Sequence, residues 1–196
     1  MAKATRKMAT ALAVSATLLT ARAATAAGAS ERATIVLHVD DFSGLLPADV
    51  EAAASVTRRV FAGAGIRTIW AYGRNRRLRI EGAVHLKVLV LSKEMAEQKI
   101  ATDGVPDNVL GQAAKECGRA YIFSRRIAAL AARNERPIGD LLGRVIAHEV
   151  GHLLLPEKSH SAIGIMSSSL DLKPAALPAF TREQTAAIRQ RVTSAN

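Results

Sequence analysis

Short apolar stretches rich in β-branched residues predict the strands of this chain. In the clearest of them, residues 84–91, apolar side chains recur at every second position, so one face of the strand is apolar. Residues 105–114 contain Pro106 and Gly111 and therefore suit a loop with a short edge strand. The other strands predicted in this way are 34–39, 66–72 and 118–124.

Apolar residues at helical spacing predict helices between and after these strands. The first, 47–61, starts at Pro47, which suits the first turn of a helix. The last, 181–192, starts at a capping box in which Thr181 is the N-cap residue and Gln184 stands three residues on. The remaining predicted helices are 93–100, 127–133 and 138–154.

This order of elements, without an internal repeat, predicts a single α+β domain over residues 30–196. We expect a twisted mixed sheet, with the helix 138–154 at the functional site and a closing helix at the C-terminal end. A chain of 196 residues is long enough to bury one core of ordinary size.

Residues 1–29 predict a secretory signal peptide. Three basic residues stand among the first seven, an uncharged stretch of 12 residues follows at 8–19, and small residues lie near positions 26 and 29. A membrane anchor is the alternative, but 12 residues fall short of the roughly 20 that span a bilayer. We therefore expect a secreted or periplasmic protein with no membrane span after the signal is removed.

The formal net charge of the whole chain is +10, and part of it belongs to the predicted signal. Residues 1–29 hold four basic residues and no acidic one, so the remainder carries 23 basic and 17 acidic residues, a net charge of +6. Some of this excess of basic residues lies in the run 74–79, which could contact an anionic surface. No aromatic residues interleave these arginines, so we expect a solvated loop between two strands and no nucleic-acid partner.

Cys117 is the one cysteine of the chain, so no intramolecular disulfide can form. The fold must then rest on its apolar core even in an oxidising compartment. We expect Cys117 to be a partly buried structural thiol.

The candidate chemistry lies in the sequence HEVGH at residues 148–152. In a helix, His148 and His152 lie on one face one turn apart and can present two imidazoles to a single ion. Glu149 stands beside them, where a carboxylate can act as a general base without occupying a coordination position. This arrangement predicts a zinc site with its own catalytic base.

A catalytic zinc ion typically takes three protein ligands. Pro156 should end the helix soon after His152, because proline cannot continue it and restricts the residue before it. The following loop leads to His160, the predicted third ligand. Glu157 in the same loop and Glu183 farther on are the alternatives. His38 and His85 fall within strand patterns and are expected to be core or surface residues.

These residues resemble the metzincin metallopeptidases, with a layout similar to that of the matrix metalloproteinases. The resemblance consists of an HExxH helix, a chain reversal, a histidine followed by serine (His160 and Ser161) and a methionine turn at 164–166. The family motif HExxHxxGxxH would place a glycine at Leu155 and the third histidine at Lys158. In this chain the histidine comes two residues later.

The resemblance implies a role for each motif residue. Glu149 would be the general base and Met166 would form the apolar floor beneath the metal. An antiparallel edge strand within 105–114 would bind peptide substrate, and the helix 181–192 would close the domain. The implied zinc ligands are His148, His152 and His160.

The predicted function is a secreted zinc-dependent endopeptidase that hydrolyses peptide bonds with a zinc-activated water and Glu149 as general base. Its cofactor would be one Zn²⁺ ion, and its substrate a peptide or protein. Two alternatives come from other classes: a non-catalytic domain stabilised by zinc, and a secreted module whose basic loop binds an anionic surface polymer.

Overall fold

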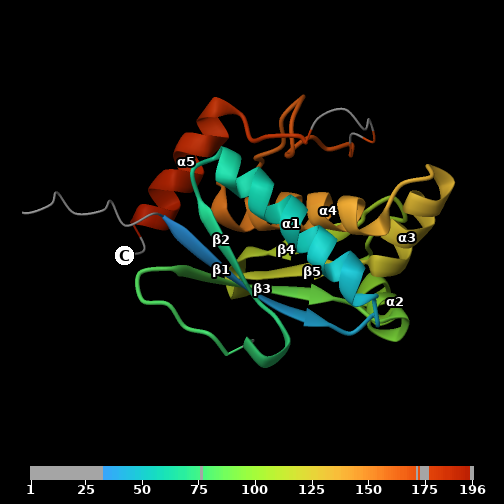
Figure 1. Cartoon of the computed structure of the whole chain (residues 1–196). Helices are drawn as coiled ribbons and strands as arrows, with labels where there is room; N and C mark the ends of the chain where they lie inside the picture. The colour runs from blue at the N-terminus through green and yellow to red at the C-terminus, as the bar shows by residue number, and fades with distance from the viewer. Residues whose placement is uncertain (1–32, 76, 171, 173–176, 195–196) are drawn as a thin grey trace, which may run out of the picture. The chain divides into compact units, whose positions relative to one another are not determined.

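One mixed sheet forms the framework of the computed structural model, which describes residues 33–75, 77–170, 172 and 177–194 (Figure 1). The signal peptide predicted for residues 1–29 lies outside these ranges. Within them five strands run in the order β2-β1-β3-β5-β4. All neighbouring pairs are parallel except β4 with β5, so β4 is an antiparallel edge strand. The strands are β1 (Thr34–Asp41), β2 (Arg67–Ala71), β3 (Val84–Val90), β4 (Gly111–Ala114) and β5 (Arg119–Ile122).

Five α-helices complete the described part of the chain, which confirms the α+β class. Each predicted helix is present within a few residues of its expected bounds. The short edge strand expected within 105–114 is β4, so the strand expected over 118–124 is the fifth along the chain. The helices are α1 (Pro47–Gly63), α2 (Lys93–Asp103), α3 (Ser124–Arg133), α4 (Ile138–Leu154) and α5 (Arg182–Thr193), with 3-10 turns η1 (Gly73–Asn75) and η2 (Lys115–Cys117).

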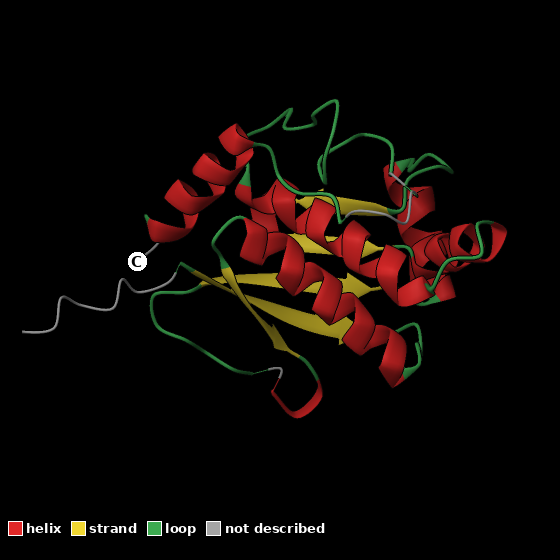
Figure 2. Ribbon diagram, turned by 45° about the horizontal axis from the view of Figure 1, so that its top comes forward, coloured by secondary structure: helices red, strands yellow, loops and turns green. Residues whose placement is uncertain are grey.

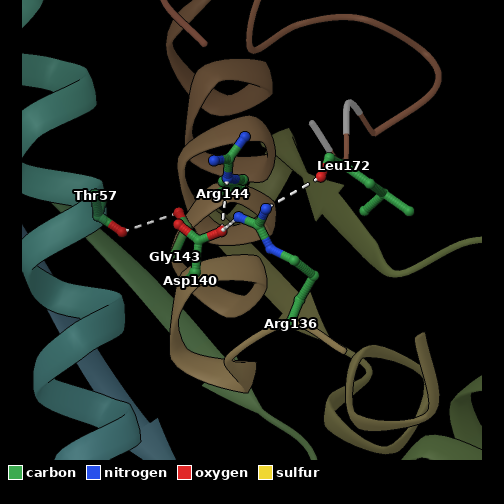
Figure 3. Close-up of polar contacts among 6 residues, drawn as sticks. All are labelled: Thr57, Arg136, Asp140, Gly143, Arg144 and Leu172. Carbon is green, nitrogen blue, oxygen red and sulfur yellow. Dashed lines mark hydrogen bonds and ion pairs between the residues drawn. The ribbon is translucent and has the colours of Figure 1, made fainter. Parts of the chain in front are cut away.

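Helices α1 and α4 lie side by side on one face of the sheet (Figures 1 and 2). Alternate residues of the central strands, such as Leu37 and Val88, point into the apolar core beneath them. The two helices approach closely at Gly143, where a β-carbon would lie 2.6 Å from the carbonyl oxygen of Ala53. The buried hydroxyl of Thr57 donates to the Gly143 carbonyl oxygen at 3.1 Å (Figure 3). This contact fixes α4 against α1.

A cluster of charged side chains holds the first turns of α4 (Figure 3). Asp140 accepts hydrogen bonds from Arg136 Nη2 at 2.7 Å and from Arg144 Nε at 3.1 Å. The Arg144 side chain is 3% exposed. Arg136 Nη1 also donates to the Leu172 carbonyl oxygen at 3.2 Å, so the cluster joins α4 to the segment that follows the methionine turn.

The opposite face of the sheet is covered in part. Met95 and Ile100 of α2 belong to a second, smaller apolar cluster with Leu89 and Tyr121. The connection between β2 and β3 lies on this same side (Figure 1).

No helix in the described ranges is long and apolar enough to cross a bilayer. The expectation that Cys117 is partly buried was wrong, because its side chain is exposed. Cys117 ends the turn η2 between β4 and β5, and Gly118 follows it with a φ of 60°. Residues of such tight turns project into solvent.

Candidate metal centre

The last turns of α4 carry the two motif histidines. His148 and His152 lie on one face of the helix, as their spacing predicts, and their Nε2 atoms are 3.0 Å apart. The helix ends at Leu154, and Leu155 already has an extended backbone. Pro156 thus stops the helix where the sequence indicates.

The loop after Pro156 turns the chain back toward the helix. Lys158 has a φ of 56°, a left-handed conformation that is uncommon for residues other than glycine. The chain thus reverses three residues beyond Leu155, the position of the glycine in HExxHxxGxxH. The third histidine therefore comes later than in that motif. The Nε2 atom of His160 lies 3.1 Å from that of His152.

Three histidines therefore meet at one point, close enough to hold a metal ion. His148, His152 and His160 form the one such group found in the described part of the chain, with ligand atoms within 4.8 Å of one another. Neither Glu157 nor Glu183 belongs to this group. His38 and His85 lie elsewhere, on the less covered face of the sheet, with His38 Nε2 and His85 Nδ1 2.9 Å apart.

The hydrogen bonds of these rings fit a metal site. His148 Nδ1 lies 2.7 Å from the Ile165 carbonyl oxygen, which can only accept, so Nδ1 carries the proton and Nε2 keeps its lone pair. His152 Nδ1 lies 3.1 Å from the Ser159 hydroxyl. Nitrogens bound tetrahedrally at about 2.0–2.1 Å from one zinc ion would lie roughly 3.3 Å apart, close to the separations here. Partners such as the Ile165 carbonyl oxygen and the Ser159 hydroxyl orient a metal-binding imidazole through its second nitrogen.

Burial favours the neutral form of two of these imidazoles. It lowers the pKa of His148, assisted by the charge of His160 and opposed by the bond to Ile165. It also lowers the pKa of His152 to about 4, together with the charges of His148, His160 and Lys115. A neutral imidazole is the form that binds a metal.

Gln184 supports the loop that carries His160. Its Oε1 accepts from the Thr181 amide at 3.0 Å, which completes the predicted capping box of α5. Its Nε2 donates to the Ser159 carbonyl oxygen at 2.9 Å and to the Ser161 hydroxyl at 3.2 Å, on either side of His160. The sequence indicated the first role through its capping spacing but gave no signal for the second.

Glu149 lies beside the three histidines without joining them. Its side chain is buried against β4, where the Ala113 backbone amide donates to the carboxylate. Burial raises the pKa of Glu149 to about 8, and the bond from Ala113 opposes that shift. A β-carbon at Gly111 would lie 2.6 Å from Cγ of Glu149, so only glycine leaves room for the side chain in this position.

Met166 lies beneath the helix that carries the ligands. Its side chain is fully buried, and a β-carbon at Gly151 would lie 2.5 Å from its sulfur. Its carbonyl oxygen accepts from the Ser161 amide at 2.9 Å, so this turn and the His160 loop are joined. The turn depends on Gly164, whose φ is 83° and whose β-carbon would lie within 2.3 Å of the Ala179 carbonyl oxygen.

A cavity of about 470 Å³ opens beside the histidines and Glu149. Its apolar lining residues include Val109, Val145 and Leu170, and its charged ones include Lys115 and Glu157. The Lys115 ammonium group donates to the Leu155 carbonyl oxygen and so connects the turn after β4 to the end of α4. The cavity gives a ligand access to both the histidines and the carboxylate.

No model of a known protein family matches this sequence, and no curated protein matches it either.

Proposed function

We propose that this protein is a zinc-dependent endopeptidase of the metzincin type, with His148, His152 and His160 as the zinc ligands and Glu149 as the general base. The observation that carries the proposal is a buried carboxylate beside three converging imidazoles, at the wall of an open cavity. Structural zinc sites use four protein ligands, whereas three leave a position open for substrate or water.

Each group of the site has a part in this reaction. Zinc, when bound, supplies Lewis-acid polarisation of the scissile carbonyl and lowers the pKa of a coordinated water toward about 7. Glu149 takes the proton of the attacking water and delivers it to the leaving amine. The amide of Ala113 orients that carboxylate, and Met166 packs under the ligand helix. Together these roles describe hydrolysis by general acid–base catalysis.

The edge strand β4 suggests how a peptide would bind. It pairs with β5 on one side only within the described sheet, and it borders the cavity. An extended peptide can add to such an edge through backbone hydrogen bonds. That placement would bring its scissile bond beside Glu149.

The deciding experiment compares wild type with Glu149→Gln. We expect the variant to retain one zinc ion per chain by elemental analysis while its turnover of a peptide substrate falls roughly 10²- to 10⁴-fold. Wild-type activity should be lost on chelation and restored by added zinc. Glu157→Gln is the matched control, since it removes an exposed carboxylate from the rim of the same cavity.

Two outcomes would contradict the proposal. Undiminished activity of Glu149→Gln would remove the assigned base. Zinc binding by the wild type without cleavage in a broad peptide screen would instead favour a non-catalytic zinc domain.

A further inference from the structure

The face of the sheet opposite to α1 and α4 carries a row of basic side chains. His38, Lys87 and Arg119 are register partners on β1, β3 and β5, so they lie next to one another across three strands. Arg119 also bonds to the side chain of Tyr121, which raises the pKa of its guanidinium group. Like charges placed opposite each other on neighbouring strands destabilise a sheet. Lys87 and Arg119 are such a pair, so their placement side by side does not stabilise the sheet.

The connection between β2 and β3 brings more cations to the same face (Figure 1). Arg79 Nη1 lies 3.2 Å from His38 Nε2, and His85 Nδ1 lies 2.9 Å from that same nitrogen. The Ile80 amide donates to His85 Nε2 at 3.4 Å. Through these contacts the segment that carries Arg79 lies beside the sheet, and residues 77–79 are exposed, as expected for a solvated loop.

A recess of about 480 Å³ lies between this segment and the sheet. Its charged lining consists of four basic side chains and one carboxylate, Asp40, which pairs with Lys87 at 3.2 Å. The Lys87 side chain remains 44% exposed. The recess shares no lining residue with the cavity at the metal centre. Its basic residues are Arg77, Arg79, Lys87 and Arg119.

We propose that this recess is a second binding site, for a flexible polyanion without nucleobases that bears phosphate or sulfate groups. Arginine and lysine side chains that line one recess match the charge and hydrogen-bonding capacity of such groups. A concave recess suits a narrow chain better than a flat bilayer or a rigid duplex. Its lining includes no phenylalanine, tyrosine or tryptophan on which nucleotide bases could stack.

The test measures binding of fluorescent inorganic polyphosphate and of fluorescent dextran sulfate at several salt concentrations. The double variant Lys87→Gln/Arg119→Gln should bind about tenfold more weakly or worse, with a salt dependence smaller by about two counterions. Arg182→Gln/Arg191→Gln is the matched control, because it removes the same charge from exposed positions of α5 and should bind like wild type. The two polymers distinguish a phosphate from a sulfate ligand.

Three results would overturn this site. The first is that neither polymer binds saturably, and the second is that the α5 control loses as much affinity as the strand variant. The third is that single-stranded DNA or vesicles with anionic lipid bind as tightly as the two polymers, or more tightly. Thermal unfolding checks that each variant is folded, and Arg77→Gln/Arg79→Gln tests the recess from the loop side if the strand variant is unstable. None of these measurements depends on peptidase activity.

Discussion

Single residues set the position of the candidate base. Glu149 is 7% exposed, and burying a carboxylate costs free energy unless a partner compensates for it. The Ala113 amide is one partner, and a cation held by the nearby histidines would be a second. Gly111 leaves the space in which this arrangement forms.

Gly111→Ala should move the proposed base, Glu149, away from the candidate metal site. The added methyl group would displace the Glu149 side chain, and a shift of about 1 Å in a catalytic group can cost roughly 10²-fold in rate. We expect that loss in peptide turnover with zinc content unchanged. Gly63→Ala is the control, because its β-carbon would meet no atom within 4 Å. Full activity in Gly111→Ala would show that Glu149 needs no fixed position.

At the scale of elements, the proposed ligands of the candidate metal centre are held by two helices. Two histidines belong to α4, whereas the loop of the third is hydrogen-bonded to the first turn of α5 through Gln184. Gln184 as a whole is 8% exposed, so water competes little for these bonds. The closing helix is therefore part of the support of the metal site.

Gln184→Glu tests this support without removing the helix cap. A glutamate still accepts from the Thr181 amide, but its carboxylate faces the Ser159 carbonyl oxygen without a proton to donate. We expect zinc affinity to fall about tenfold to 100-fold, as for other partners of metal ligands, when measured by competition with a chelating dye. Gln190→Glu in the same helix is exposed and should bind zinc like wild type.

Asp140→Ala should destabilise the start of α4. It removes one partner of Arg144, whose side chain is 3% exposed, and breaking a buried ion pair costs about 3–5 kcal/mol. Urea unfolding should show a loss near the lower end of that range, because Asp140 itself is 21% exposed. Glu51→Ala removes the exposed pair with Arg58 and should cost less than about 1 kcal/mol. Equal losses in both variants would refute a special role for Asp140.

The sequence predicted the elements well because their signals are local. The alternation in 84–91 and the capping box at Thr181 need no knowledge of the fold, and HEVGH fixes its own geometry once it is helical. The contact of Gly111 with Glu149 depends on which strand borders α4. The row formed by Lys87 and Arg119 depends on β3 and β5 being neighbours. Such relations arise from topology, so they were not predicted.

For the whole molecule, the question is whether the fold needs the metal. The buried side of α4 packs into the main core, with Leu142, Ile146 and Val150 each at most 2% exposed. The His160 loop has its own hydrogen bonds to α5. The core and the metal centre are thus separate sources of stability.

Chelation should therefore lower the thermal midpoint without unfolding the protein at 25 °C. The expected shift follows from the free energy of zinc binding to the folded state, and far-UV circular dichroism should remain helical after treatment with EDTA. Complete unfolding on chelation would favour the alternative of a domain stabilised by zinc, as in zinc fingers.

The three histidines all lie within residues 148–160, a single short stretch of the chain. Ligands so close in sequence can meet an ion before the sheet has assembled. The unfolded chain would then compete with the native state for zinc, and the stabilisation by zinc would be smaller than its affinity for the native site suggests. If the three histidines bind zinc as proposed, the chain can capture the ion before it folds.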